Sequence, residues 1–232
     1  MTPSPRKRRL FVAVCLGLAV LFVGLGVWQV QRLFWKLDLI ERVDARIHAP
    51  PRPVPTSWRG LSPADIEYRR VRARGRLLND RQTFVDALTE RGAGFWVLTP
   101  LETSGETILV NRGFVPRDKR DVINKPGGTA TITGLLRLSE PGGRFLRRNR
   151  PEQDLWYSRD VAAIARQRGL GPTAPVFIDA EAASNEGGYP VGGLTVVKFR
   201  NAHLVYALTW FGLAALCVAG LVLLLKPAQK RD

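Results

Sequence analysis

Two long apolar runs lie near the ends of the chain, and everything between them is mixed in polarity. Residues 10–30 are apolar up to Gln29, and residues 204–225 contain no charged side chain. An α-helix rises about 1.5 Å per residue, so about 20 apolar residues span a hydrocarbon layer of about 30 Å. The pattern predicts tails at 1–9 and 226–232, transmembrane helices at 10–30 and 203–225, and a β-rich domain at 31–202.

The first run could instead belong to a cleaved signal peptide, because basic residues precede it at positions 6–9. Its length argues against this, since a signal peptide has an apolar region of about 7–15 residues. No small-x-small cleavage site follows the run. We therefore expect it to remain as a helix that spans the membrane.

The basic residues that flank the two runs predict the orientation. Four stand at positions 6–9, and Lys226, Lys230 and Arg231 follow the second run. Arg32, Lys36, Lys198 and Arg200 on the opposite side are a counter-signal, but long loops cross membranes largely regardless of charge. We expect a multi-pass protein of a bacterial inner (plasma) membrane, with both termini in the cytoplasm. The main domain would then face the periplasm or an equivalent compartment.

The segment between the runs has the alternation that is typical of strands, with turns that contain glycine and proline between them. Residues 49–55 are rich in proline and should end the first helix, and residues 62–65 look like a helix cap. Residues 158–168 predict one short helix, capped by Ser158 and ended by Gly169. The fold class is therefore a membrane α+β protein, with a mostly antiparallel sheet or small partly open barrel. The predicted strands are residues 68–78, 94–101, 106–110, 129–137, 175–179 and 194–199.

The chain is strongly basic, with 35 Lys and Arg against 20 Asp and Glu and a net charge of +15. Nucleic acid is not the expected partner, because no zinc knuckle or RNP-like run is present. Contact with lipid head groups, an acidic ligand and a solvated basic face all remain open. The basic run 144–150, which contains two apolar residues, is interpreted as a solvated loop, with contact to a partner or to lipid as its alternatives.

The residues that usually carry catalysis are scarce. The sequence has two histidines, and it lacks a G-x-S-x-G motif, an H-E-x-x-H motif and a phosphate-binding glycine loop. Asp118 with Asp121, or Asp179 with Glu181, could act as acid and base, but such spacings are common on solvated loops. Cys15 and Cys217 lie inside the apolar runs, where packing is the expected role. We do not expect an enzyme, nor a copper-delivery domain, since the central segment lacks cysteine and methionine.

His203 stands where the second apolar run begins. On a helix, Tyr206 and Trp210 share its face, and the first helix brings Trp28, Gln29 and Arg32 to a similar depth. Imidazole is a normal axial ligand of haem iron, and arginine suits propionates. An aromatic belt at the membrane interface would give the same pattern without any cofactor.

Several motifs together resemble the Surfeit locus protein 1 family, whose members are assembly factors of haem–copper cytochrome oxidase. The resemblance begins with Trp28-Gln29-Val30-Gln31-Arg32 and extends nearly end to end. The matching segments are residues 25–36, 68–76, 94–101, 109–116, 156–160, 190–193 and 201–210.

The resemblance implies a function in holding or delivering haem a to the catalytic subunit of the oxidase. It implies His203 as the haem ligand and Trp28 as a residue that lines the site. Gln29, Arg32, Tyr206 and Trp210 are added to that site by helical spacing alone. Relatives often read Asn-Asn-His where this chain has Asn201-Ala202-His203, so the hydrogen bonding next to the ligand can differ.

Two further interpretations stay open. The protein could be a cofactor-free scaffold that stabilises an oxidase assembly intermediate, or an unrelated lipid- or ligand-binding module with two anchors. The expected partners are the oxidase catalytic subunit, haem-synthesis or other assembly proteins, and membrane lipid. Asn111-Arg112-Gly113 is interpreted as a strand-to-strand turn with a salt bridge, and a docking contact is its alternative.

Overall fold

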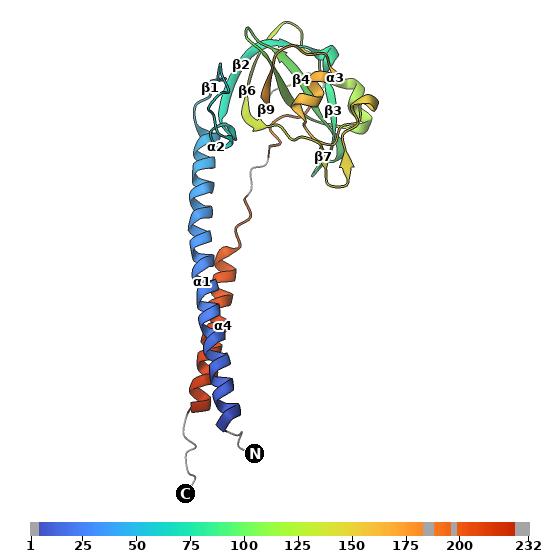
Figure 1. Cartoon of the computed structure of the whole chain (residues 1–232). Coiled ribbons are helices and arrows are strands. Elements are labelled where there is room, and N and C mark those ends of the chain that lie inside the picture. Colours follow the sequence, from blue (N-terminus) through green and yellow to red (C-terminus); the bar gives the residue numbers. More distant parts are fainter. Residues whose placement is uncertain (1–4, 183–187, 196–198, 226–232) are drawn as a thin grey trace. The chain divides into compact units, whose positions relative to one another are not determined.

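The computed structural model describes residues 5–182, 188–195 and 199–225. Helices α1 (Pro5–His48) and α4 (His203–Leu225) stand near the two ends of the chain, and a β-rich unit lies between them in the sequence. Both helices are long and apolar enough to cross a membrane. The chain divides into one compact unit of Met1–Arg42 with Lys198–Asp232 and a second of Val43–Val197. Two apolar helices that flank a β-rich domain are what the sequence predicted (Figure 1).

Helix α1 continues without a break well past its apolar run, to His48. Pro50, Pro51 and Pro53 follow directly, and proline supplies no amide hydrogen for a helix. The short helix α2 (Pro63–Ile66) has the predicted cap, because the Ser62 and Asp65 side chains each bond the other residue's backbone amide. This capping box satisfies two amides that the first helical turn would leave free.

The strands of the central unit form one seven-stranded sheet in the order β1-β2-β6-β9-β5-β4-β3. A short antiparallel pairing between β2 and β4, through Arg76 with Glu102 and Leu77 with Leu101, closes five of these strands into a small barrel. The strands are β1 (Arg52–Pro53), β2 (Arg70–Leu77), β3 (Thr83–Thr89), β4 (Gly92–Glu102), β5 (Thr107–Pro116), β6 (Thr129–Leu138) and β9 (Thr173–Ala180).

The sheet is mostly antiparallel, as predicted, with two parallel pairs, β1–β2 and β5–β9. A separate two-stranded hairpin consists of β7 (Gly143–Arg144) and β8 (Arg147–Arg148). Short 3-10 turns complete the unit at η1 (Asn79–Arg81), η2 (Arg117–Val122) and η3 (Pro151–Gln153).

Among the described residues, the buried side chains of the core form three clusters. Val71, Leu101 and Ile178 belong to one cluster of buried side chains, and Leu109, Trp156 and Ile164 belong to another, to which helix α3 (Val161–Gln167) contributes. Strand β5 supplies both clusters through alternate residues, so nine of its ten positions are buried. Residues 108–110 are therefore apolar on both faces of the sheet, whereas Asn111 and Arg112, which are also buried, are polar.

A polar network occupies a buried site beside the barrel. The Asp179 side chain is 2% exposed, and its Oδ2 accepts from Arg137 at 2.9 Å. Its Oδ1 accepts from Asn111 at 2.8 Å and from Arg159 at 3.4 Å. A buried carboxylate costs free energy unless it is paired, and these donors provide the pairing. The Asp179 carboxylate is therefore held by neighbouring side chains of the fold, and the Glu181 carboxylate is also paired, with Arg70.

Several local predictions were wrong. Asp160 rather than Ser158 caps α3, because its side chain accepts the Ala163 amide. Strand β3 was not predicted, although Thr83, Val85 and Ala87 alternate inward. In the predicted strand 194–199, residues 194, 195 and 199 are not strand, and residues 196–198 lie outside the described part of the chain.

The tripeptide Asn111-Arg112-Gly113 lies within β5 and is not a turn. Arg112 is buried and donates to the Asn124 carbonyl at 2.8 Å, whereas its Nη1 has no hydrogen-bond partner among the described residues. No salt bridge of Arg112 occurs in that part of the chain, and burial lowers the pKa of its guanidinium. The predicted ion pair is therefore wrong.

Candidate functional site

Helices α1 and α4 pack along a seam with a seven-residue repeat. The buried and half-buried positions of each helix include a series in which steps of three and four residues alternate. This spacing places one stripe of each helix toward its neighbour, as in a left-handed coiled coil. On α1 the series is Val12, Cys15, Ala19, Phe22, Gly26, Gln29, Leu33 and Lys36. On α4 it is His203, Ala207, Trp210, Ala214, Cys217, Leu221 and Leu224.

Three contacts fix the antiparallel register of this pair. Gln29 meets His203, the ring of Phe22 stacks on that of Trp210, and Arg8 donates to the carbonyl of Leu224. Phe22 lies seven residues before Gln29, and Trp210 lies seven residues after His203. Arg8 lies a further fourteen residues before Phe22, and Leu224 lies fourteen residues after Trp210. The two helices lie side by side in Figure 1.

His203 is the first residue of α4, and it is polar at a position where the repeat places side chains in the seam. Its Nδ1 lies 2.7 Å from Oε1 of Gln29, which is 9% exposed. An amide oxygen only accepts, so Nδ1 must carry the proton. In the neutral ring, Nε2 is then the atom with a free lone pair, and no hydrogen bond to it occurs among the described residues.

The neighbouring aromatic residues divide into two groups. The rings of Trp210 and Phe22 have centroids 5.7 Å apart and an interplanar angle of 25°, so Trp210 is packed in the seam. Trp28 and Tyr206 are 50% and 54% exposed and lie off the seam. The Arg32 guanidinium lies 4.7 Å from the ring centroid of Trp35. Of the six residues predicted for the site, the structure places His203, Gln29 and Trp210 on the seam and the other three on its outer side.

The seam offers one ligand atom rather than a metal cage. Among the residues that the structure describes, no group of three or more His, Cys, Asp or Glu side chains could hold a metal ion. A histidine whose Nδ1 proton is bound by an acceptor presents Nε2 in a fixed direction, which is the usual arrangement of metal-bound histidine. The Nε2 atom of His203 could supply one bond to a metal that brings its other ligands with it.

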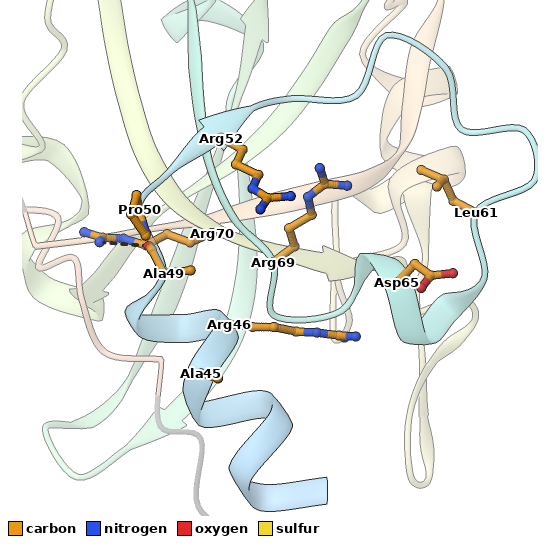
Figure 2. Close-up of a pocket in the computed structure, with 9 residues that line it drawn as sticks. All are labelled: Ala45, Arg46, Ala49, Pro50, Arg52, Leu61, Asp65, Arg69 and Arg70. Carbon is orange, nitrogen blue, oxygen red and sulfur yellow. Dashed lines mark hydrogen bonds between the residues drawn. The ribbon is translucent and has the colours of Figure 1, made fainter.

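A second feature, which the sequence did not predict, lies in the β-rich unit. A pocket of about 440 Å³ is bordered by Arg46, Arg52, Arg69, Arg70 and Asp65 (Figure 2). Four arginines and one aspartate border it, and Arg70 is paired with Glu181, so the lining keeps an excess of positive charge. Such a surface favours an anion. The only sequence signal was the general excess of arginine, which does not distinguish a pocket from a solvated face.

Comparison with known proteins decides the family. The SURF1 family model matches residues 16–215 of the chain, and this range contains the contacting pair Gln29 and His203 and the arginine pocket. The chain belongs to the SURF1 family. It is 40% identical to Surfeit locus protein 1 of Rattus norvegicus, over 83% of this chain and 68% of the relative.

Other relatives extend the similarity across distant organisms. The chain is 39% identical to Surfeit locus protein 1 of Homo sapiens, over 87% of this chain and 73% of the relative. It is 35% identical to the SURF1-like protein of Monosiga brevicollis, over 94% of this chain and 88% of the relative. The SURF1 match covers both compact units, so the family likeness includes the paired helices as well as the barrel.

Proposed function

We propose that this chain is a two-pass membrane protein of the bacterial inner membrane, or of an equivalent membrane, that assists the assembly of haem–copper cytochrome oxidase. The SURF1 family is generally known for cytochrome oxidase assembly, and the chain matches it from residue 16 to residue 215. Helices α1 and α4 would cross the bilayer, with both termini in the cytoplasm and the β-rich unit on the opposite side. The charge-free run of α4 and the basic residues that flank both helices support this arrangement.

The topology can be tested with reporter fusions. Alkaline phosphatase fused after Gly105, which lies in the turn between β4 and β5, should be active only if the β-rich unit is exported. A green fluorescent protein fused after residue 232 should fluoresce only if the C-terminus stays in the cytoplasm. The reverse pattern in both fusions would exclude the proposed orientation.

Within this function we propose that the protein holds haem a for the catalytic subunit, with His203 as a ligand through Nε2. The observation that carries this proposal is the contact of 2.7 Å between Nδ1 of His203 and Oε1 of Gln29. This contact leaves the lone pair of Nε2 available to bind a metal, at a seam position that is otherwise suited to apolar packing. Bound haem would supply the iron; the chain would hold it and orient the imidazole.

The other residues of the proposed site have lesser functions. Trp210 would form one wall of the site within the seam, because it already stacks on Phe22. Trp28 and Tyr206 are exposed to the surroundings of the helix pair and could cover the outer side of a porphyrin. Arg32 would need to leave Trp35 in order to pair with a propionate.

A cofactor-free scaffold is the second candidate, and the same exposed side chains favour it. Trp28, Phe34 and Trp35 are 50%, 62% and 49% exposed on α1, which leaves an aromatic surface for another transmembrane helix. The partner would then be the oxidase catalytic subunit or another assembly protein. In that case His203 and Gln29 would only fix the register of the helix pair.

Haem occupancy separates the two candidates. The full chain is expressed in a host that makes haem a, purified in detergent, and examined by absorption spectroscopy. His203→Ala should lose the haem bands, whereas His48→Ala should keep them, because His48 is exposed and bonds only Asp44 among the described residues. Full occupancy in His203→Ala would exclude the ligand assignment. A wild-type protein without haem that still co-purifies with the oxidase subunit would favour the scaffold.

A further inference from the structure

The pocket drawn in Figure 2 contains two arginines that the fold itself does not use. Arg46 donates to the Ala64 carbonyl, and Arg70 binds both carboxylate oxygens of Glu181, at 2.6 and 2.9 Å. These hydrogen bonds, which Arg70 donates to Glu181, keep the pKa of Arg70 above its ordinary value. In contrast, neither Arg52 nor Arg69 makes a side-chain hydrogen bond or ion pair within the described residues.

The one carboxylate on the rim is already engaged. Asp65 Oδ2 accepts from the amide and the hydroxyl of Ser62, at 3.1 and 2.5 Å. These bonds, the side-chain one first, lower the pKa of Asp65, so it remains charged at neutral pH. Asp65 therefore caps α2, and although its charge attracts Arg69, no hydrogen bond or ion pair joins it to Arg52 or Arg69 among the described residues.

The fold nevertheless holds Arg52 and Arg69 on the same cavity. Strand β1 pairs in parallel with β2, so that Arg52 stands opposite Val71. Arg69 precedes β2 directly, and its carbonyl accepts the Leu136 amide at 2.9 Å. The preceding residue, Tyr68, has a φ of 62°, which is uncommon for a non-glycine residue. Figure 2 shows the two guanidinium groups directed toward each other across the pocket.

Two like charges that face a shared space repel each other, and an anion between them would reverse the sign of the interaction. Guanidinium groups bind carboxylate and phosphate through paired hydrogen bonds. A carboxylate is satisfied by one guanidinium fork, whereas a phosphate has enough oxygens to meet two forks from opposite sides. The pocket volume of about 440 Å³ lies in the range of small-molecule sites, which is more space than a bare ion needs.

We propose that Arg52 and Arg69 form a binding site for the phosphate group of an organic phosphate. Arg46 and Arg70 border the site; Arg46 adds positive charge, whereas the charge of Arg70 is balanced by Glu181. Asp65 also belongs to the lining. The phosphate could belong to a soluble ester or to a lipid head group. The site does not depend on haem or on an oxidase partner, because all of its residues belong to the β-rich unit.

The test uses the purified full chain in detergent and glycerol 3-phosphate as the soluble probe. Calorimetric titration is carried out at constant ionic strength, with chloride as the compensating anion. Saturable binding is expected, and Arg52→Gln or Arg69→Gln should each weaken it by about tenfold or more, since each removes charged hydrogen bonds. Arg72→Gln is the matched control, because Arg72 is an exposed neighbour on β2 outside the pocket.

A second arm identifies a lipid source. The chain is reconstituted in nanodiscs with phosphatidate or with phosphatidylcholine, and retained lipid is counted by native mass spectrometry. Selective retention of phosphatidate that is lost in Arg69→Gln and kept in Arg72→Gln would assign the site to lipid. The proposal is overturned if neither probe binds saturably, or if Arg72→Gln weakens binding as much as Arg69→Gln. Far-ultraviolet circular dichroism of each variant verifies that the barrel is folded.

Discussion

The Nδ1 atom of His203 lies 2.7 Å from Oε1 of Gln29, and the two residues are separated by 174 positions in the sequence. Both stand in the heptad series of their helices, where the other α4 positions are Ala, Trp, Cys and Leu. A polar pair at such positions fixes the register of two helices, because any slip would leave both groups without a partner.

Gln29→Leu should therefore weaken the helix pair. It leaves the His203 Nδ1 proton without its acceptor, and a polar contact of this kind contributes about 1 kcal/mol within a membrane helix pair. Gln31→Leu is the matched control, since Gln31 is exposed and makes no hydrogen bond among the described side chains. Unfolding by sodium dodecyl sulfate, followed by tryptophan fluorescence, measures both. Equal effects of the two substitutions would contradict the assigned contact.

The register also predicts that Cys15 and Cys217, both free thiols, occupy opposing seam positions. Each lies seven residues beyond the stacked pair of Phe22 and Trp210. A membrane-permeant oxidant such as iodine should join them, with two electrons and two protons passing to the oxidant. Mass spectrometry of the linked peptides reports the product. The control is the double variant Cys15→Ser with Leu16→Cys, in which disulfide formation should fall sharply because Leu16 is 53% exposed and off the seam. Equal disulfide formation in the wild type and the double variant would disprove the register.

Gly26 allows the two helices to approach closely. A Cβ atom at this position would lie 2.6 to 2.9 Å from three ring atoms of Phe211. Gly26→Leu should therefore separate the helices and lower the resistance of the pair to sodium dodecyl sulfate by about 1–3 kcal/mol. Gly24→Leu should have little effect, since nothing lies within 4 Å of a Cβ there. Similar losses in both variants would mean that Gly26 is not at the contact.

The sequence was informative where the signal is local. Apolar length predicted α1 and α4, alternation predicted five of the strands, and the Ser62 and Asp65 pair predicted the cap of α2. Closure of the barrel was not predictable in the same way, because β2 and β4 pair through a register between distant segments. Strand β3 was missed because Phe84 and Leu88, which lie off its buried face, are apolar and obscure the alternation.

The candidate site shows the same limit. Helical spacing placed Tyr206 three residues from His203 on one broad face, but the buried stripe begins with a step of four, to Ala207. Tyr206 therefore lies outside the seam. Gln29 and His203 could each be selected from the sequence, whereas their direct contact depends on the crossing of two helices, which no single helix encodes.

Gly113 should be essential to the barrel. Its φ is +129°, and a Cβ atom would lie 2.1 Å from the Val191 carbonyl oxygen. Phe114 and Val191 exchange backbone hydrogen bonds at 2.9 Å directly beside it, so the backbone has no room to yield. Gly113→Ala should cost at least about 2 kcal/mol, seen as a fall in melting temperature of several degrees. Gly127→Ala, with open space around it, is the control; an equal melting temperature for both would disprove this role.

Acid stability should depend on Glu140. Burial alone would raise the pKa of this carboxyl, but the hydrogen bonds and charge of Arg159 outweigh it and hold the pKa below the ordinary value of 4.5. The Arg159 Nε and Nη2 atoms bond its two oxygens at 3.0 and 2.5 Å. Because the folded pKa is lowered, the pair stabilises the barrel fully above pH 4.5. That contribution is lost as the pH falls through the lower folded pKa.

Glu140→Gln should therefore lower the melting temperature at pH 7, and the difference from the wild type should narrow as the pH falls below 4.5. Glu102→Gln is the matched control, because the ion pair of Glu102 with Arg76 is exposed on both sides and solvent screens it. Asp65, whose pKa is also lowered, loses its stabilising effect in all three proteins over the same pH range, so the difference between curves isolates Glu140. A constant gap between wild type and Glu140→Gln from pH 7 to pH 3 would show that the loss comes from packing and not from the charge of Glu140.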